Sequence, residues 1–208
     1  MFKMVHNMIM SVIPDLLPVI IIIAVITCSL RITYLIKSHK KFVLYKELYA
    51  LIFILYILCL FEVVTFQDVN YGTSNFMPFR EIFRYDFGTR LFFKNIIGNI
   101  LLFLPYGYFV SDILKVKKPW LTIILTILVS STIEVVQLHI GRTFDIDDII
   151  LNTMGGTCGY LLYYGFSCLV SHLPNGIKND NVVNFIIVII ILIVIIYSFN
   201  LNIFNWFD

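Results

Sequence analysis

Six ionisable side chains fall within fifteen positions near the centre of the chain, where the flanking sequence is apolar. They are Glu134, His139, Arg142, Asp145, Asp147 and Asp148, with the amides of Gln137 and Asn152 beside them. Charged groups at the level of a membrane are costly and mark a functional site by default. Arginine presents a planar fork of donors to carboxylate or phosphate. Carboxylates suit general acid and base catalysis or ligation of Mg²⁺ and Ca²⁺. We therefore expect a polar site here, although these residue types do not identify its ligand.

The remaining composition is that of a membrane protein. The 208 residues are 60% hydrophobic and 13% charged, with a mean hydropathy of +0.92, whereas soluble domains are roughly 45–50% apolar and about 25% charged. We expect a single membrane domain over residues 1–208, without a separate soluble domain. The net charge of +2 and the scattered basic residues give no case for nucleic acid. The four cysteines lie in apolar runs without metal-ligand spacing, which is typical of packing residues. The chain also lacks a zinc motif and a phosphate loop, and we expect no metal site and no cofactor.

Six apolar segments are long enough, or nearly so, to cross about 30 Å of hydrocarbon. They cover roughly residues 13–36, 48–66, 95–113, 119–138, 147–170 and 183–204. Segments 95–113 and 119–138 are the weakest because they carry polar residues. The fold class expected is therefore all-α, a polytopic transmembrane bundle of about six helices. Lysines gather in the connections after the first and third segments, and more weakly after the fifth, which predicts that these three connections are cytoplasmic. The polar cluster then lies on the extracellular side of the cell membrane.

Helical spacing gathers the polar residues on few faces. Thr126, Ser130, Glu134 and Gln137 follow at intervals of four, four and three, which places them on one face of segment 119–138. Asn95 and Asn99 are separated by four residues in the preceding segment. Few polar groups are expected deeper than the outer third of these segments.

The following segment, 147–170, repeats this pattern. Asp148, Asn152, Gly155 or Gly156, and Gly159 share one face. The glycines permit close approach by a neighbouring helix, and Asp145 or Asp147 is placed to cap the start of the helix.

Several of these residues also have purely structural interpretations. The asparagines serve equally as hydrogen-bond links between helices, Asp147 and His139 as solvated groups, and Glu62 as a group reaching the interface. For Glu134, Arg142 and Asp148, the structural alternative is an ion-pair network that locks two helices together. Residues 79–93 carry aromatic side chains at helical spacing, which predicts an amphipathic helix on the membrane surface. The alternative is a lid folded over the polar cluster.

Four motifs in order give the chain a resemblance to a known family, the VanZ-like membrane proteins. The first is Asn75, Pro78 and Phe79, and the second is Asn99, Phe103, Pro105 and Gly107. The third is Glu134 and Gln137. The fourth is Arg142, Asp145, Asp148, Asn152, Gly155, Gly156 and Gly159. The resemblance covers about residues 75–165, which we take as the VanZ-like core.

The resemblance implies a bacterial cell-envelope protein that lowers susceptibility to teicoplanin-type glycopeptides. On this basis we expect a lipid-linked or drug headgroup to bind at the polar cluster, with Arg142 holding an anionic group. The partners expected are membrane lipids and a cell-wall precursor or glycopeptide. An enzyme acting on a lipid headgroup or cell-wall precursor is the alternative, and a small-solute transporter is a third. The candidate ligand-binding residues are Glu134, Gln137, Arg142, Asp145, Asp148, Asn152, Asn99, Asn95 and Asn75.

Overall fold

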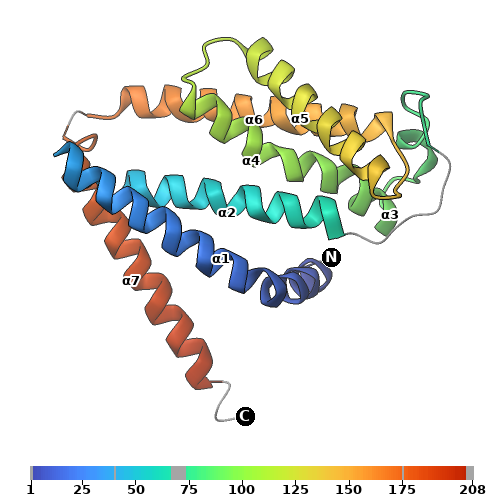
Figure 1. Cartoon of the computed structure of the whole chain (residues 1–208). Helices are drawn as coiled ribbons and strands as arrows, with labels where there is room; N and C mark the ends of the chain where they lie inside the picture. Colours follow the sequence, from blue (N-terminus) through green and yellow to red (C-terminus); the bar gives the residue numbers. More distant parts are fainter. Residues whose placement is uncertain (1, 40, 67–73, 175, 205–208) are drawn as a thin grey trace. The chain divides into compact units, whose positions relative to one another are not determined.

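The computed structural model describes residues 2–39, 41–66, 74–174 and 176–204, which form an all-helical chain (Figure 1). The long helices are α1 (Phe2–Ser38), α2 (Leu44–Phe66), α4 (Gly98–Ile113), α5 (Pro119–His139), α6 (Ile146–His172) and α7 (Asp180–Phe204). Three short elements precede α4, namely the 3₁₀ turn η1 (Ile82–Arg84), α3 (Arg90–Phe92) and the π turn η2 (Phe93–Ile97). No strand occurs within these ranges, so the all-α fold predicted from the sequence is confirmed.

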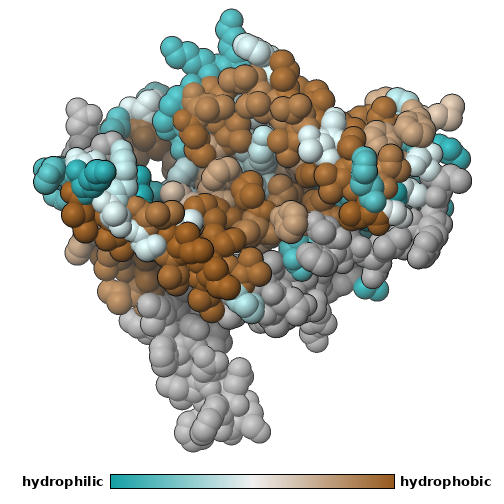
Figure 2. Space-filling model, viewed as in Figure 1, coloured by the Kyte–Doolittle hydropathy of each residue, from teal (hydrophilic) through white to brown (hydrophobic). Residues whose placement is uncertain are grey.

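Four helical stretches of the described residues are long and apolar enough to cross a membrane. They are Ile21–Ser38, Leu44–Val64, Arg90–Ile113 and Pro119–His139. The last two include the segments that the sequence marks as weakest. α6 has the length, but its first turns carry Asp147, Asp148 and Asn152. On the face seen in Figure 2, hydrophobic side chains predominate, and hydrophilic ones lie mainly toward its edges. The chain is therefore a membrane protein.

The chain divides into two compact units, with boundaries inside α2 and at the end of α6. One unit comprises α1, α7 and the part of α2 up to Leu55. Within this unit, Tyr45 joins α2 to α7. Its backbone N–H donates to Asn184 Oδ1 at 3.0 Å, and its hydroxyl donates to Asp180 at 2.9 Å. Arg31 of α1 forms an ion pair of 2.7 Å with Glu47 of α2. These polar contacts tie the three helices together.

The other unit, Tyr56–Ser171, contains the polar cluster. The second part of α2 packs against α4 through a core of Leu60, Val64, Phe103 and Tyr106. α4 and α6 meet backbone to backbone, because a Cβ atom on Gly107 would overlap the Gly156 carbonyl, and one on Gly159 would overlap the Leu104 carbonyl. This geometry confirms that the glycines of segment 147–170 permit close helix approach. It holds the polar faces of α4, α5 and α6 together.

Residues 79–93 do not form the predicted amphipathic helix. The segment contains turns, η1 and α3 in its place. Phe79 has a φ of 68°, which ends any regular helix there. The backbone N–H groups of Phe79, Glu81 and Ile82 donate to the Asp147 carboxylate and not to helical carbonyls. The segment thus folds back onto the start of α6.

Candidate functional site

A buried polar seam runs along α5. Its members are Thr122, Thr126, Ser130, Glu134 and Gln137, which are all at most 7% exposed. The predicted polar face of segment 119–138 is therefore confirmed. The seam also continues to Thr122, whose hydroxyl shares a hydrogen bond of 2.8 Å with Ser111 of α4. The expectation that few polar groups lie deeper in these helices is wrong, because small hydroxyl side chains bond to neighbouring helix groups and still permit close packing.

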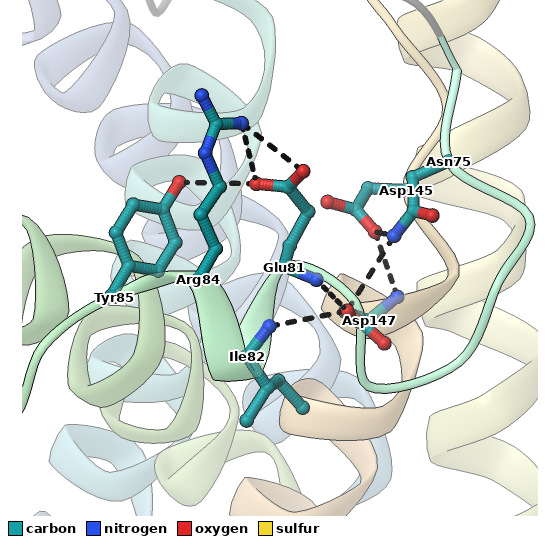
Figure 3. Close-up of polar contacts among 7 residues, drawn as sticks. All are labelled: Asn75, Glu81, Ile82, Arg84, Tyr85, Asp145 and Asp147. Atoms are coloured by element: carbon teal, nitrogen blue, oxygen red, sulfur yellow. Dashed lines mark hydrogen bonds and ion pairs between the residues drawn. The ribbon is translucent and has the colours of Figure 1, made fainter.

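The connection between α5 and α6 is fixed by Asp145 and Asn75. The Asp145 side chain accepts a hydrogen bond from the Asp147 N–H at 2.9 Å, which makes Asp145 the N-cap of α6. Asn75 pairs with Asp145 as an isolated parallel bridge, and its amide donates to the Asp145 carboxylate at 2.9 Å (Figure 3). The Asn75 side-chain oxygen accepts from Met77 N–H. Asn75 therefore has both ends of its amide engaged within the protein.

Asp147 is not the solvated charge expected from the sequence. Its side chain is 1% exposed. It accepts a backbone hydrogen bond from Phe79. It also accepts one from Glu81 at 2.7 Å and one from Ile82 at 3.3 Å (Figure 3). These backbone donors satisfy the buried side chain and fix the backbone around it. Asp147 therefore organises the loop at residues 77–82, and its role is structural.

A small cavity lies at the end of the α5 seam that carries Glu134 and Gln137. It is lined by Val63, Val64, Asn99, Leu102, Phe103, Ile133, Glu134, Gln137, Arg142, Asp148 and Asn152. These residues come from α2, α4, α5, α6 and the connection after α5. The volume is about 40 Å³, and a buried water needs roughly 10–15 Å³. The cavity therefore admits a small polar group or a few waters.

Each amide on the cavity wall donates to a protein group. Asn99 donates to Asp148 Oδ1, Asn152 to Ser130 Oγ at 2.9 Å, and Gln137 to the Val64 carbonyl at 3.3 Å. Asn152 is 5% exposed, and its Oδ1 has no hydrogen-bond partner in the described part of the chain. A buried acceptor without a partner costs free energy unless a ligand or water satisfies it. Asn152 therefore offers a binding atom to the cavity.

Arg142 contacts α2 in place of the expected carboxylates. Its Nη1 donates to the Val64 carbonyl at 2.8 Å, near the end of α2, where helix carbonyls lack intrahelical donors. Four ion pairs occur among the described residues, and none of them includes Arg142. The ion-pair network considered as a structural alternative for these residues therefore does not occur among the described residues. Sequence reasoning missed Val63 and Val64, because backbone carbonyls leave no signal in side-chain patterns.

Six of the nine candidate residues line the cavity, namely Asn99, Glu134, Gln137, Arg142, Asp148 and Asn152. Asn75, Asn95 and Asp145 lie outside the lining. Asn95 lies in η2, and Asn75 and Asp145 hold the α5–α6 connection. His139 is exposed, as expected, and Glu62 does not line the cavity. Within the described ranges, no three His, Cys, Asp or Glu side chains are grouped to hold a metal ion.

The Asp145 carboxyl links the cavity to the loop. Its backbone N–H donates to Glu134 Oε2 at 2.8 Å, and its side chain is partly buried beneath Asn75. Burial raises the pKa of Asp145 above its ordinary value of 3.8, against the hydrogen bonds from Asp147 and Asn75 that lower it. The connection between α5 and α6 thus contains a carboxyl group that holds its proton more tightly than an exposed aspartate does.

Comparisons with known proteins give a family match and a relative of similar sequence. The family model described as VanZ/LLP1 matches residues 48–170. Protein VanZ of Enterococcus faecium is 32% identical over 113 residues, which are 53% of this chain and 67% of that protein. No solved structure matches the chain. The family model covers more of the chain than the four sequence motifs do, because it begins at residue 48 and includes the second part of α2. That part of α2 contributes Val63 and Val64 to the cavity wall.

Proposed function

Because the chain belongs to the VanZ/LLP1 family, we propose that it is a cell-envelope protein that lowers susceptibility to teicoplanin-type glycopeptides. It does so by binding the headgroup of a lipid-linked molecule or of the drug in the cavity between α2, α4, α5 and α6. The positive-inside distribution of lysines supports an extracellular position for this cavity. Membrane lipids, a cell-wall precursor or the glycopeptide itself are the partners.

The observation that carries this proposal is the unpartnered acceptor of Asn152 in a cavity that also contains Glu134, Arg142 and Asp148. A site built only for stability satisfies its buried polar atoms internally. Here an acceptor faces a space of about 40 Å³, which takes the tip of a headgroup, while the rest of the ligand lies outside. Glu134 and Asp148 contact the ligand, and Asn99 and Gln137 position the wall.

The direct test is teicoplanin susceptibility in a deletion host. Empty vector, wild type, Glu134→Gln and Arg142→Ala are compared at equal protein levels in the membrane. Glu62→Gln is the matched control, because Glu62 is also a carboxylate within an apolar helix but does not line the cavity. We expect protection by wild type and Glu62→Gln, and none by the two cavity variants. Equal protection by all four proteins would make the cavity structural.

A membrane enzyme is the second candidate, favoured by two carboxylates on one cavity wall. Glu134 and Asp148 would act as general acid and base toward a lipid headgroup or cell-wall precursor. This candidate predicts a new lipid product in extracts of cells that express wild type, absent with Asp148→Asn. Unchanged lipid profiles in a strain that is still protected would leave binding as the function.

A further inference from the structure

We propose that the cavity binds a primary ammonium group carried on a short apolar stem. This inference rests on the proposed binding function and names the class of its ligand. The sequence alone favours an anion held by Arg142, whereas the contacts in the cavity favour a cation.

The charges on the cavity wall determine whether a cation or an anion is the preferred ligand. Glu134 and Asp148 contribute two carboxyl groups, and Arg142 contributes one guanidinium. The wall carries one net negative charge when both carboxyls are ionised, and a bound cation favours that state. One nitrogen of Arg142 is already engaged by the Val64 carbonyl. An anion entering this space would meet two like charges at close range, in surroundings where charges are weakly screened. A monovalent cation balances the wall.

The hydrogen-bonding groups point to an N–H-rich ligand. The bonds formed by the described residues use Oε2 of Glu134 and Oδ1 of Asp148. The second oxygen of each carboxylate, together with Asn152 Oδ1, remains as an acceptor. The wall amides donate to Asp148, Ser130 and Val64. An ammonium group has three donors and no acceptor, which matches three oxygens on one wall.

The size and apolar part of the cavity narrow the class further. Val63, Leu102, Phe103 and Ile133 also line it, so a methylene stem next to the charge contacts apolar surface. A quaternary ammonium is bulkier than the primary group and has no N–H to satisfy the three acceptors. A bare divalent cation requires about six oxygen ligands, and only two carboxyl groups line this cavity. The structure thus selects a primary amine among small cations.

The experiment measures thermal unfolding of the purified full-length chain in phosphatidylcholine nanodiscs. Ethanolamine, choline and inorganic phosphate are titrated at constant ionic strength. A ligand that binds only the folded state raises the Tm with its concentration. We expect ethanolamine to raise the Tm, and choline and phosphate to leave it unchanged. An equal rise with choline or with phosphate would overturn the proposal, as would no rise with ethanolamine.

A double variant tests the acceptor itself. Asn152→Leu combined with Ser130→Ala removes both partners of a buried hydrogen bond, a change that is often near neutral for stability. We expect it to weaken ethanolamine binding about tenfold or more, since it deletes a hydrogen bond to a charged group. The control variant is Asn95→Leu, which removes an amide in η2, outside the cavity lining. Its Tm should respond to ethanolamine as that of wild type does. An unchanged response of the double variant would contradict the assignment.

Two sources of the amine are distinguished in the same assay. If the ligand is a lipid headgroup, nanodiscs that contain phosphatidylethanolamine raise the Tm. The further rise in Tm on addition of free ethanolamine is then smaller. If it is a free amine, such as that of a peptide or drug, the lipid has no effect and the response to ethanolamine persists. The outcome also separates this inference from the proposed function. Protection that depends on Asn152 without any amine response would sustain the function and refute the ligand class.

Discussion

The Glu134 carboxylate accepts a hydrogen bond of 2.8 Å from the backbone N–H of Asp145. This contact joins the buried polar seam of α5 to the residue that caps α6. Asp145 in turn is held by Asn75 at 2.9 Å. A displacement of the loop at residues 75–82 therefore acts on the cavity wall through one residue, and the loop and the cavity form a connected unit.

The first prediction concerns acid sensitivity. Burial raises the pKa of Asp145 in the folded protein above 3.8, so the folded state binds this proton more tightly than the unfolded state. The contribution to stability is therefore present at low pH and is lost as the pH rises through the raised pKa. Asp145→Asn keeps the N-cap and removes the titration.

Thermal unfolding in detergent from about pH 3 to about pH 8 measures this difference. We expect the stability of wild type relative to Asp145→Asn to fall with rising pH. A relative stability that rises over the same range would contradict the burial of this carboxyl.

The second prediction concerns the buried carboxylate of Asp147. Asp147→Asn removes charge-assisted hydrogen bonds from Phe79, Glu81 and Ile82 and points amide donors at backbone donors. Such bonds contribute about 1.5–3 kcal/mol each before compensation, and we expect a loss on the order of 2–4 kcal/mol. Asp86→Asn, at an exposed site in the same loop region, should change stability by less than about 0.5 kcal/mol. Similar losses in both variants would argue against a specific role.

The third prediction concerns the contact between α4 and α6. Gly159→Ala places a Cβ against the Leu104 carbonyl, and overpacking of this kind costs about 1–3 kcal/mol or more. Gly165 lies in the same helix with no atom within 4 Å of its Cβ position. Gly165→Ala should therefore be neutral or stabilising by about 0.5–1 kcal/mol. Chemical denaturation of both variants provides the comparison, and an equal loss would place the helix contact elsewhere.

The fourth prediction concerns orientation. The four native cysteines are exposed and are replaced by alanine to give a background without thiols. His139→Cys, beside the connection that carries Arg142, should react with a membrane-impermeant maleimide in intact cells. Lys117→Cys, at the opposite end of α5, should react only after permeabilisation. The reverse pattern would place the cavity on the cytoplasmic side.

The predictions that the structure confirms are those based on the spacing of residues along helices. The interval from Thr126 through Ser130 to Glu134 predicts one buried face, and the glycines of segment 147–170 predict close packing. Both are confirmed, because helix geometry relates residues three and four positions apart whatever surrounds them. The same geometry gathers Asp148 and Asn152 on the cavity wall.

The incorrect parts depend on contacts between distant segments. In the sequence, Asp147 is interpreted as a surface charge next to Asp148. Its burial depends on backbone N–H groups from residues 79–82. The aromatic spacing in 79–93 predicts a helix, but those N–H groups are used elsewhere. Arg142 reads as a partner for carboxylates, whereas the Val64 carbonyl takes one of its nitrogens. Backbone donors and acceptors are invisible to side-chain patterns.

The central claim is that the cavity binds a ligand and does not only stabilise the fold. The most direct test measures protection against teicoplanin and thermal stability together in one variant, Asp148→Asn. The amide oxygen still accepts from Asn99, and removal of a partly buried charge spares its desolvation cost. We therefore predict that Asp148→Asn unfolds at the same temperature as wild type or higher, yet no longer protects against teicoplanin. Protection equal to that of wild type, or lost only in step with a lower unfolding temperature, would show that the cavity is structural.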